Sequence, residues 1–358
     1  MAAGEMRAWR THAYGEPLEA LKLDVVPIPD PGPGELRIKV DAIPLNLNDL
    51  ERITGGNMMV RPELPYSPGM EVMGTVDACG DGTGQWAGRR VVSIPTGAHG
   101  GFAEYAICPV ASTFEMPESV PLPDAAALFF PFHLAWLGLI DRAGLQKGES
   151  VLIHAAAGGS GSAAVQLAVD RGARVFATAG TDEKVRLCQE LGAQVAINYN
   201  TSDFAEIVLR ETDSKGVDVV FDNVGEAVLE KSLQCTKYNG RYLMMGFASN
   251  KAVADEPFIV PRRIALGNLK LCGVLLSYQE PDALDFLKTG MGWNFIPNEM
   301  GVRIMDEIVQ LVLSKKVRPV IGRVVDFEDI PTAIDAMARR ETVGRTVALT
   351  GTSRFSSI

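Results

Sequence analysis

Short β-type runs and turn clusters alternate along the chain up to about residue 130. Apolar and β-branched positions dominate 36–40, 71–76 and 90–94, and turn clusters at 27–34 and 81–84 separate these runs. Short strands punctuated by Pro and Gly are typical of an all-β or barrel-like domain.

A regular alternation of β-branched runs and helical segments replaces this pattern between about residue 133 and residue 278. Because parallel strands need crossover helices, the alternation predicts an α/β fold with a doubly wound parallel sheet. The six predicted strands are 151–153, 174–178, 195–197, 217–221, 241–245 and 269–276.

The last part of the chain has helical segments at 281–289 and 301–314, followed by mixed α/β sequence around 317–325 and 346–349. A segment of this length is too small for a core of its own, so we expect it to pack onto the first part. The chain is therefore expected to form one domain from 1–132 and 279–358, interrupted by a second domain at 133–278.

The longest apolar stretch, 125–140, is interrupted by Pro131 and His133. It is shorter than the roughly 20 residues of a membrane-spanning helix, so we interpret it as a buried core helix and expect no membrane partner. The first thirty residues contain no apolar signal core, and no export or organelle signal is expected.

Composition narrows the class of protein further. The 358 residues are 47% hydrophobic and 22% charged, which indicates a globular and not a disordered chain. A net charge of −10 disfavours nucleic acid as a partner, because an acidic surface repels phosphate backbones. The five cysteines form no CxxC pair, which argues against a disulfide framework or a structural zinc site and favours the cytoplasm.

A glycine-rich sequence between a predicted strand and a predicted helix carries the clearest chemical signal. It fits the dinucleotide-binding pattern G-x-G-x-x-G with alanine in the first position. Gly158 allows the backbone to approach a pyrophosphate, Gly161 allows close packing of the helix on the strand, and the helix N-terminus attracts negative charge. The expected cofactor-binding residues of this loop are Ala157, Gly158, Gly159, Ser160 and Gly161.

The nucleophile elbow of α/β-hydrolases is an alternative for a strand, a Gly/Ser turn and a helix. Its pattern G-x-S-x-G fails here, because the fifth residue from Gly158 is Ser162. We interpret His154, at the end of the same strand, as an interior histidine and not as the partner of a catalytic serine.

The end of the second strand of this βαβ unit indicates which nicotinamide cofactor fits. NAD-preferring sites place an acid there to hold the ribose 2′-hydroxyl, whereas this chain has Ala179, Gly180 and Thr181. Lys184 and Tyr199 are candidates to bind a 2′-phosphate, which favours NADPH. Lys184 as a solvated surface residue is the alternative, and the acids at 182 and 183 are able to restore a preference for NAD.

Together these motifs resemble the medium-chain dehydrogenase/reductase superfamily, and within it the zinc-free quinone oxidoreductase branch that includes zeta-crystallin. The resemblance covers nearly the whole chain and implies a Rossmann sheet inserted into a GroES-like β-barrel catalytic domain, and a homodimer. The motifs that carry it lie at 46–49, 68–71, 88–91, 100–105, 151–161, 177–180, 222–225 and 245–248.

The same resemblance separates this chain from zinc-dependent relatives. These carry a Cys at the position of Asn46, a His at the position of Met70 and a four-cysteine lobe after the barrel, and this chain has none of them. An amide and a thioether do not build the ligand set that activates an alcohol, so no metal site is expected.

Without a metal, the expected chemistry is transfer of hydride from NADPH to a quinone or an α,β-unsaturated carbonyl compound. Asn46 is similar in position to the family's polar residue beside the nicotinamide, and we expect it to donate a hydrogen bond to the substrate carbonyl. Asp49 either braces a nearby loop or transfers a proton. The resemblance also implies cofactor contacts from Asn223, Gly246, Phe247 and Ala248, and from Val274, Leu275 and Leu276, which we expect to close the last strand.

Two departures from the family pattern leave a second function open. Leu134 stands where relatives often have a Thr near the nicotinamide, and Glu51 stands where zeta-crystallin-like proteins have a Tyr. The alternative is an NADPH-binding protein with a structural or interaction role and little turnover.

Overall fold

The computed structural model describes residues 4–56, 61–246 and 261–351. Phe247 and Ala248, two of the expected cofactor-binding residues, lie outside these ranges. The chain divides into two compact units. The first unit comprises Met1–Phe129, Ser277–Val309 and Ile321–Ile358, and the second comprises Phe130–Leu276 and Gln310–Val320.

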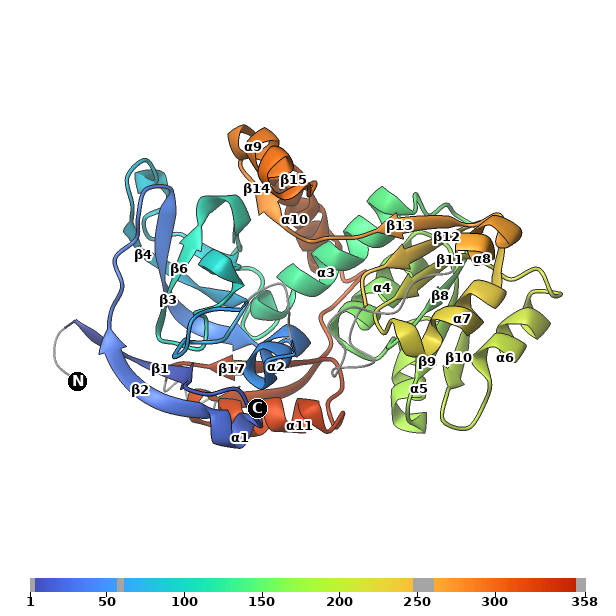
Figure 1. Cartoon of the computed structure of the whole chain (residues 1–358), viewed down its shortest axis with the longest axis horizontal. Helices are drawn as coiled ribbons and strands as arrows, with labels where there is room; N and C mark the ends of the chain where they lie inside the picture. The colour runs from blue at the N-terminus through green and yellow to red at the C-terminus, as the bar shows by residue number, and fades with distance from the viewer. Residues whose placement is uncertain (1–3, 57–60, 247–260, 352–358) are drawn as a thin grey trace. The chain divides into compact units, whose positions relative to one another are not determined.

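A mostly antiparallel sheet forms the centre of the first unit (Figure 1). Its strands are β3 (Glu35–Pro44), β4 (Val72–Cys79), β5 (Arg90–Ser93), β6 (Tyr105–Pro109), β7 (Thr113–Glu115), β16 (Ile321–Asp326) and β17 (Arg345–Leu349). They follow the order β16-β17-β3-β4-β5-β7, and β6 pairs with β3. Buried Leu36, Ile38 and Val40 alternate with Arg37 and Lys39 along β3, so one face of this strand lies in the core.

The C-terminal part of the chain completes this sheet. β17 pairs antiparallel with β3, with Val347 opposite Pro44, and β16 pairs parallel to β17. Strands from the C-terminal part and from the first part of the chain therefore share one sheet.

The remaining elements of the first unit surround the sheet. β1 (Glu5–Thr11) and β2 (Leu21–Pro27) pair antiparallel, and α1 (Pro17–Ala20), α2 (Leu47–Thr54) and α11 (Ile330–Ala338) pack against one another. Leu50 and Ile53 of α2 and Ile334 of α11 are buried in the same core as β3. The other elements are α9 (Pro281–Met291), α10 (Asn298–Leu313), β14 (Tyr278–Gln279) and β15 (Ile296–Pro297).

The second unit contains a six-stranded parallel sheet. Its strands are β8 (Ser150–Ile153), β9 (Arg174–Ala179), β10 (Val195–Asn198), β11 (Val217–Asp222), β12 (Thr236–Met244) and β13 (Lys270–Gly273). Their order, β10-β9-β8-β11-β12-β13, is the 3-2-1-4-5-6 order of a doubly wound dinucleotide-binding sheet. The predicted fold class is confirmed.

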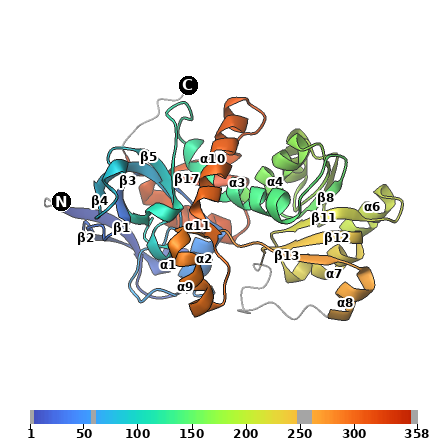
Figure 2. The same ribbon diagram turned by 90° about the horizontal axis from the view of Figure 1, so that it is seen from above.

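Helices cover both faces of this sheet. Figure 2 shows α4 (Gly159–Asp170) on one side of the strands and α7 (Glu226–Gln234) and α8 (Pro261–Gly267) on the other. α5 (Asp182–Glu190) and α6 (Phe204–Glu211) connect β9 to β10 and β10 to β11. This alternation of strand and helix matches the pattern in the sequence.

Two predicted elements differ from those observed. The last strand ends at Gly273 and not at residue 276, because the chain leaves the sheet after one further hydrogen bond from Val274 N to Met244 O. The apolar stretch 125–140 starts with a 3-10 turn (Ala125–Ala127), and helix α3 (Phe129–Trp136) then continues without a break into a π-helical turn (Leu137–Arg142), so the predicted helix is present but is not regular throughout. None of the helices in the described ranges is long and apolar enough to cross a membrane.

A short C-terminal segment, Gln310–Val320, belongs to the second unit, although the expected division placed all of 279–358 with the first. The amide of Gln166 in α4 explains this placement. Its Oε1 accepts from the backbone N–H of Arg318 and its Nε2 donates to the carbonyl of Arg318, both at 2.9 Å. The side chain of Gln166 is buried, so the segment satisfies polar atoms that would otherwise lie in the interior.

Candidate functional site

The loop between β8 and α4 has the geometry of a phosphate-binding turn. A Cβ on Gly161 would overlap the carbonyl oxygen of Ala155 and come within 2.7 Å of Ala156 Cα, so only glycine fits where the helix meets the strand. Gly158 is the N-cap of α4, in extended conformation. The amides of Gly159, Ser160 and Gly161 belong to the first helical turn, whose N–H groups have no acceptor within the helix. They are placed to bind an anion.

Ala155 adopts the left-handed conformation in this loop, with φ of +50°. A side chain in this region costs about 1 kcal/mol relative to glycine. The sequence analysis missed this residue, because alanine gives no signal of a left-handed turn.

The ends of β9 and β10 bring together the residues predicted to distinguish NADPH from NADH. A Cβ on Gly180 would lie 2.6 Å from the hydroxyl of Tyr199, so the ring of Tyr199 lies directly against this turn. Thr181 is the N-cap of α5, and its Oγ1 accepts from the backbone N–H of Lys184 at 3.2 Å. The structure therefore places Gly180, Thr181, Lys184 and Tyr199 around one strand end.

Asp182, the first residue of α5, has a partner on the neighbouring strand. Its Oδ1 accepts a hydrogen bond from Asn198 Nδ2 at 2.7 Å. Asn198 is the last residue of β10 and is paired in register with Ala179, the last residue of β9. The sequence analysis did not single out Asn198.

The segments that follow β11 and β12 bring two further predicted residues, Asn223 and Gly246, close together. Asp222, the last residue of β11, accepts from the backbone N–H of Val224 at 2.7 Å and from the hydroxyl of Tyr242 at 2.6 Å. Burial and the neighbouring Asp222 carboxylate raise the pKa of Tyr242. A Cβ on Gly246 would overlap the backbone around Asn223, so the chain after β12 passes directly over that residue.

The three residues predicted at the end of the last strand lie beyond it. Val274 still bonds to Met244, but Leu275 is exposed and Leu276 is half-buried outside the sheet. The prediction that they close the strand is therefore wrong, since pairing with β12 ends at Gly273.

In the first unit, Asn46 is the N-cap of α2 and is almost fully buried. Its Nδ2 donates to Pro44 O at 3.1 Å and to Glu71 Oε2 at 3.3 Å, and its Oδ1 accepts from Arg345 Nη1 at 2.9 Å. Both side-chain hydrogens of Asn46 are thus donated within the protein.

Asp49 joins the start of α2 to the loop before β4. Its Oδ2 accepts from Asn46 N at 3.0 Å and its Oδ1 accepts from Met70 N at 2.9 Å. Its side chain is fully buried, and this desolvation raises its pKa to about 6 against the opposing effect of nearby Arg52 and the two backbone bonds. The carboxylate therefore fixes the position of Met70 relative to Asn46.

Glu71 and Arg345 form a buried ion pair next to Asn46. Arg345 opens strand β17, and its guanidinium donates to both Glu71 and Asn46. The sequence analysis missed this pairing, because it joins positions 274 residues apart and neither local pattern signals it.

The donors around Asn46 do not fit a zinc site. Asn46 and Met70 offer an amide and a thioether, and the carboxylate of Glu71 is neutralised by Arg345. In the described ranges, no group of three or more His, Cys, Asp or Glu side chains could hold a metal ion.

His154 is an interior histidine, as expected. Its Nε2 lies 2.8 Å from Ser232 Oγ and its Nδ1 lies 3.0 Å from Thr178 Oγ1. Because the Ser232 hydroxyl donates to Val228 O, it accepts from Nε2–H, which leaves Nδ1 to accept from Thr178. Burial lowers the pKa of His154 to about 3, so the ring is neutral and has no free nitrogen for catalysis.

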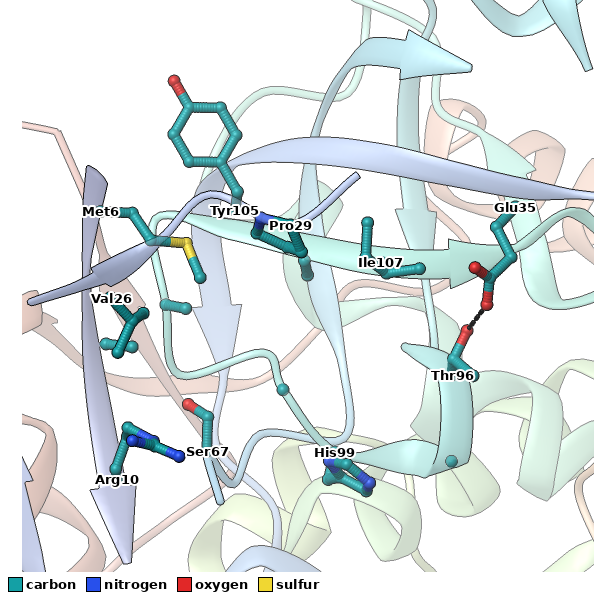
Figure 3. Close-up of a pocket in the computed structure, with 15 residues that line it drawn as sticks. Met6, Arg10, Val26, Pro29, Glu35, Ser67, Thr96, His99, Tyr105 and Ile107 are labelled. Carbon is teal, nitrogen blue, oxygen red and sulfur yellow. Dashed lines mark hydrogen bonds between the residues drawn. The ribbon is translucent and has the colours of Figure 1, made fainter. Parts of the chain in front are cut away.

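A hollow of about 390 Å³ lies in the first unit beside β1, β2 and β6 (Figure 3). Most of its wall is apolar, with Met6, Val26 and Ile107, and none of the predicted site residues lines it. Several of its polar side chains bond within the protein, among them Thr96, whose Oγ1 donates to Glu35 Oε1 at 2.7 Å. We assign no ligand to this hollow.

Comparison with known proteins agrees with this geometry. Residues 32–118 match the family described as alcohol dehydrogenase GroES-like domain, and residues 159–289 match the family described as zinc-binding dehydrogenase. The chain is 34% identical to human quinone oxidoreductase over 251 residues, which are 69% of this chain and 75% of the relative. It is 30% identical to rat quinone oxidoreductase-like protein 2 over 345 residues, 96% of this chain and 92% of the relative.

This chain belongs to the quinone oxidoreductase-like branch of the medium-chain dehydrogenase/reductase superfamily. A solved structure of a mycobacterial protein in complex with NADPH is 31% identical, with a TM-score of 0.81 over 96% of this chain and all of that chain. The family membership and the described fold make this protein an NAD(P)H-dependent oxidoreductase.

The residues of the second unit fit the nicotinamide cofactor that this family uses. At Gly158 an added Cβ would meet one non-neighbouring atom within 4 Å, Ala155 O at 3.3 Å, so the space beside the start of α4 is otherwise open. Gly161 and Gly246 allow close backbone approach at β8 and β12. Ala157 to Gly161 would hold the pyrophosphate, and Gly180 with its neighbours would hold the adenosine ribose.

Proposed function

We propose that this protein is a zinc-independent reductase that transfers hydride from NADPH to a quinone or an α,β-unsaturated carbonyl compound. In this proposal, the first unit is the catalytic domain of the protein and the second unit is its nucleotide-binding domain. The observation that carries it is the Asn46–Glu71–Arg345 network, which pairs the buried Glu71 carboxylate with a guanidinium beside Asn46 and Met70, the positions of the missing Cys and His.

The preference for NADPH is supported by the end of β9. Ala179, Gly180 and Thr181 provide no carboxylate for a ribose 2′-hydroxyl, and the hydroxyl of Tyr199 lies against Gly180. Lys184 supplies a positive charge in the first turn of α5. A 2′-phosphate is stabilised by a cation and by hydroxyl donors in such a place.

The cofactor, when bound, supplies the hydride, and the protein aligns and desolvates the reactants. Asn46 is proposed to donate a hydrogen bond to the substrate carbonyl as negative charge develops on its oxygen. For this role, Asn46 must exchange the hydrogen bond that it donates to Pro44 O or to Glu71 for one to the substrate. Asp49 is proposed to act by holding Asn46 and Met70 in place.

The test combines nucleotide binding with a screen of electron acceptors. NADPH and NADH are titrated by nucleotide fluorescence, and NADPH oxidation is followed at saturating nucleotide with benzoquinones, naphthoquinones and linear and cyclic enones. We expect turnover with at least one class and a several-fold slower rate for Asn46→Ala. Binding of NADPH without oxidation by any acceptor would refute the enzyme proposal and favour the structural or interaction role.

We further propose a homodimer formed through β13. This strand ends the sheet order, so in the described part of the chain its outer edge has no neighbouring strand. Leu271 on the strand is 39% exposed and Leu275 just after it is 41% exposed. An unprotected apolar edge favours pairing with a second copy. Light scattering during size-exclusion chromatography should give twice the mass of 38.5 kDa, and a monomer at micromolar concentration would refute this proposal.

The cytoplasm is the proposed location, supported by the state of the thiols. All five cysteines are free, and three of them, Cys108, Cys188 and Cys235, are buried. A chain that uses cysteines in this way is suited to a reducing compartment.

A further inference from the structure

Asp182, an acid next to the proposed 2′-phosphate site, accepts a hydrogen bond from Asn198. Asp182 is exposed at the start of α5, two residues after Gly180. A carboxylate there repels a phosphate and is able to accept hydrogen bonds from ribose hydroxyls, as acids in NAD sites do. Its position therefore opposes the preference for NADPH unless another group restrains it.

Asn198 is placed to provide that restraint. It is half-buried at the end of β10, where its carbonyl accepts from the backbone N–H of Ser202 at 3.0 Å. Its Oδ1 accepts from the backbone N–H of Asn200 at 3.1 Å, which fixes the side chain in a turn over the strand end.

This turn also decides which end of the Asn198 amide faces the acid. Only the oxygen is able to accept from Asn200 N–H, so the NH2 group must point to Asp182, whose Oδ1 lies 2.7 Å away. A hydrogen bond from an amide to a carboxylate is stronger than one between neutral groups, and it gives Asp182 a fixed partner on β10.

We propose that Asn198 is a specificity-determining residue for the cofactor, which acts by holding the carboxylate of Asp182 against the end of β10. This inference rests on the proposed use of NADPH and adds the residue that makes an acid compatible with it. With Asp182 held, its carboxylate does not compete with Gly180, Lys184 and Tyr199, the residues proposed to bind the 2′-phosphate. With Asp182 released, the carboxylate competes for the ribose hydroxyls, which weakens NADPH binding and strengthens NADH binding.

Two substitutions at one position separate this role from a structural one. Asn198→Ser keeps an oxygen that accepts from Asn200 N–H and so keeps the turn, but its side chain is too short to reach Asp182. Asn198→Ala removes both bonds. Thr201→Ala is the matched control, because its hydroxyl bonds to Asn198 O at 3.3 Å in the same turn and does not involve Asp182.

The experiment measures dissociation constants for NADPH and NADH by fluorescence titration, with 2′,5′-ADP and 5′-AMP as competitors that isolate the 2′-phosphate. In Asn198→Ser and Asn198→Ala we expect the preference for NADPH over NADH to fall by about five- to tenfold, the size of one lost charge interaction near a surface. Thr201→Ala should keep the wild-type ratio. In an Asp182→Asn background, Asn198→Ser should change the ratio by less than about twofold, because the restrained charge is gone.

Three results would overturn the inference, and they have different meanings. A wild-type preference for NADH would overturn the cofactor proposal and this inference together. A wild-type preference for NADPH that Asn198→Ser leaves unchanged would overturn this inference alone. A shift in Asn198→Ser that persists undiminished with Asp182→Asn would show that Asn198 acts on the nucleotide by another route. Melting curves without nucleotide, unchanged within about 2 °C for Asn198→Ser, confirm that each comparison is made on folded protein.

Discussion

The buried pair of Glu71 and Arg345 offers the sharpest test of how the first unit is held together. We consider Arg345→Met, which keeps most of the side-chain volume and removes the guanidinium. The Glu71 carboxylate is fully buried and the Arg345 side chain is 6% exposed. The substitution therefore leaves a buried charge without its cation and deprives Asn46 Oδ1 of its donor at 2.9 Å.

The size of the expected loss of stability in Arg345→Met follows from this burial. Removing one partner of a buried ion pair costs about 3–5 kcal/mol, because the remaining charge stays desolvated. For a unit of this size we expect a melting temperature lower by roughly 10 °C. The double variant Arg345→Met, Glu71→Met has no buried charge left, and it should recover at least half of the loss.

The assay is urea unfolding followed by two probes. Three of the four tryptophans, Trp9, Trp86 and Trp293, belong to the first unit, so their fluorescence reports mainly on that unit. NADPH affinity reports on the second unit and should stay within about twofold of wild type if the damage is local. A loss below about 1 kcal/mol in Arg345→Met, or a double variant as unstable as the sum of both single variants, would refute the reasoning.

Three further predictions concern the phosphate loop and the start of α2. Gly161→Ala should lower NADPH affinity at least tenfold, because a Cβ collides with the carbonyl of Ala155; titration and circular dichroism test this. Ala155→Gly should raise the free energy of unfolding by about 0.5–1 kcal/mol by removing left-handed strain. Since burial raises the pKa of Asp49 from 3.8 to about 6, wild type should gain stability relative to Asp49→Asn as pH falls from 7 through 6 towards 4, measured by urea unfolding; an unchanged difference would contradict this.

The parallel sheet was predictable from the sequence because each of its strands is a local pattern. All six strands occur where β-branched runs were found, and the fingerprint loop lies between β8 and α4. Gly161 was also predictable with its physical reason, since close packing of a helix on a strand requires the absence of a Cβ at that place. The end of the last strand could not be predicted in this way. The apolar run continues to residue 276, but hydrogen bonding to β12 decides where pairing stops.

The polar networks of the candidate site were beyond prediction from sequence. The assignment of Asn46 and Asp49 followed from a motif, but the partners of Asn46 come from elsewhere in the chain, Glu71 from the loop before β4 and Arg345 from β17. Which hydrogens of Asn46 are engaged depends on that tertiary pairing. The same holds for Asn198, whose contact with Asp182 arises because β9 and β10 end in register.

The pairing of β17 with β3 has a consequence for the synthesis of this protein. Val347 lies opposite Pro44, so the end of β3 at Ala42–Pro44 lacks its partner strand on one side until residues 347–349 have left the ribosome, whereas β6 covers the start of β3 earlier. Until that moment Glu71 and Asn46 also lack their cation, Arg345. The nascent first unit therefore presents an incomplete sheet for most of translation, and a chain that terminates before residue 345 should be a substrate for chaperones or proteases instead of a shorter enzyme.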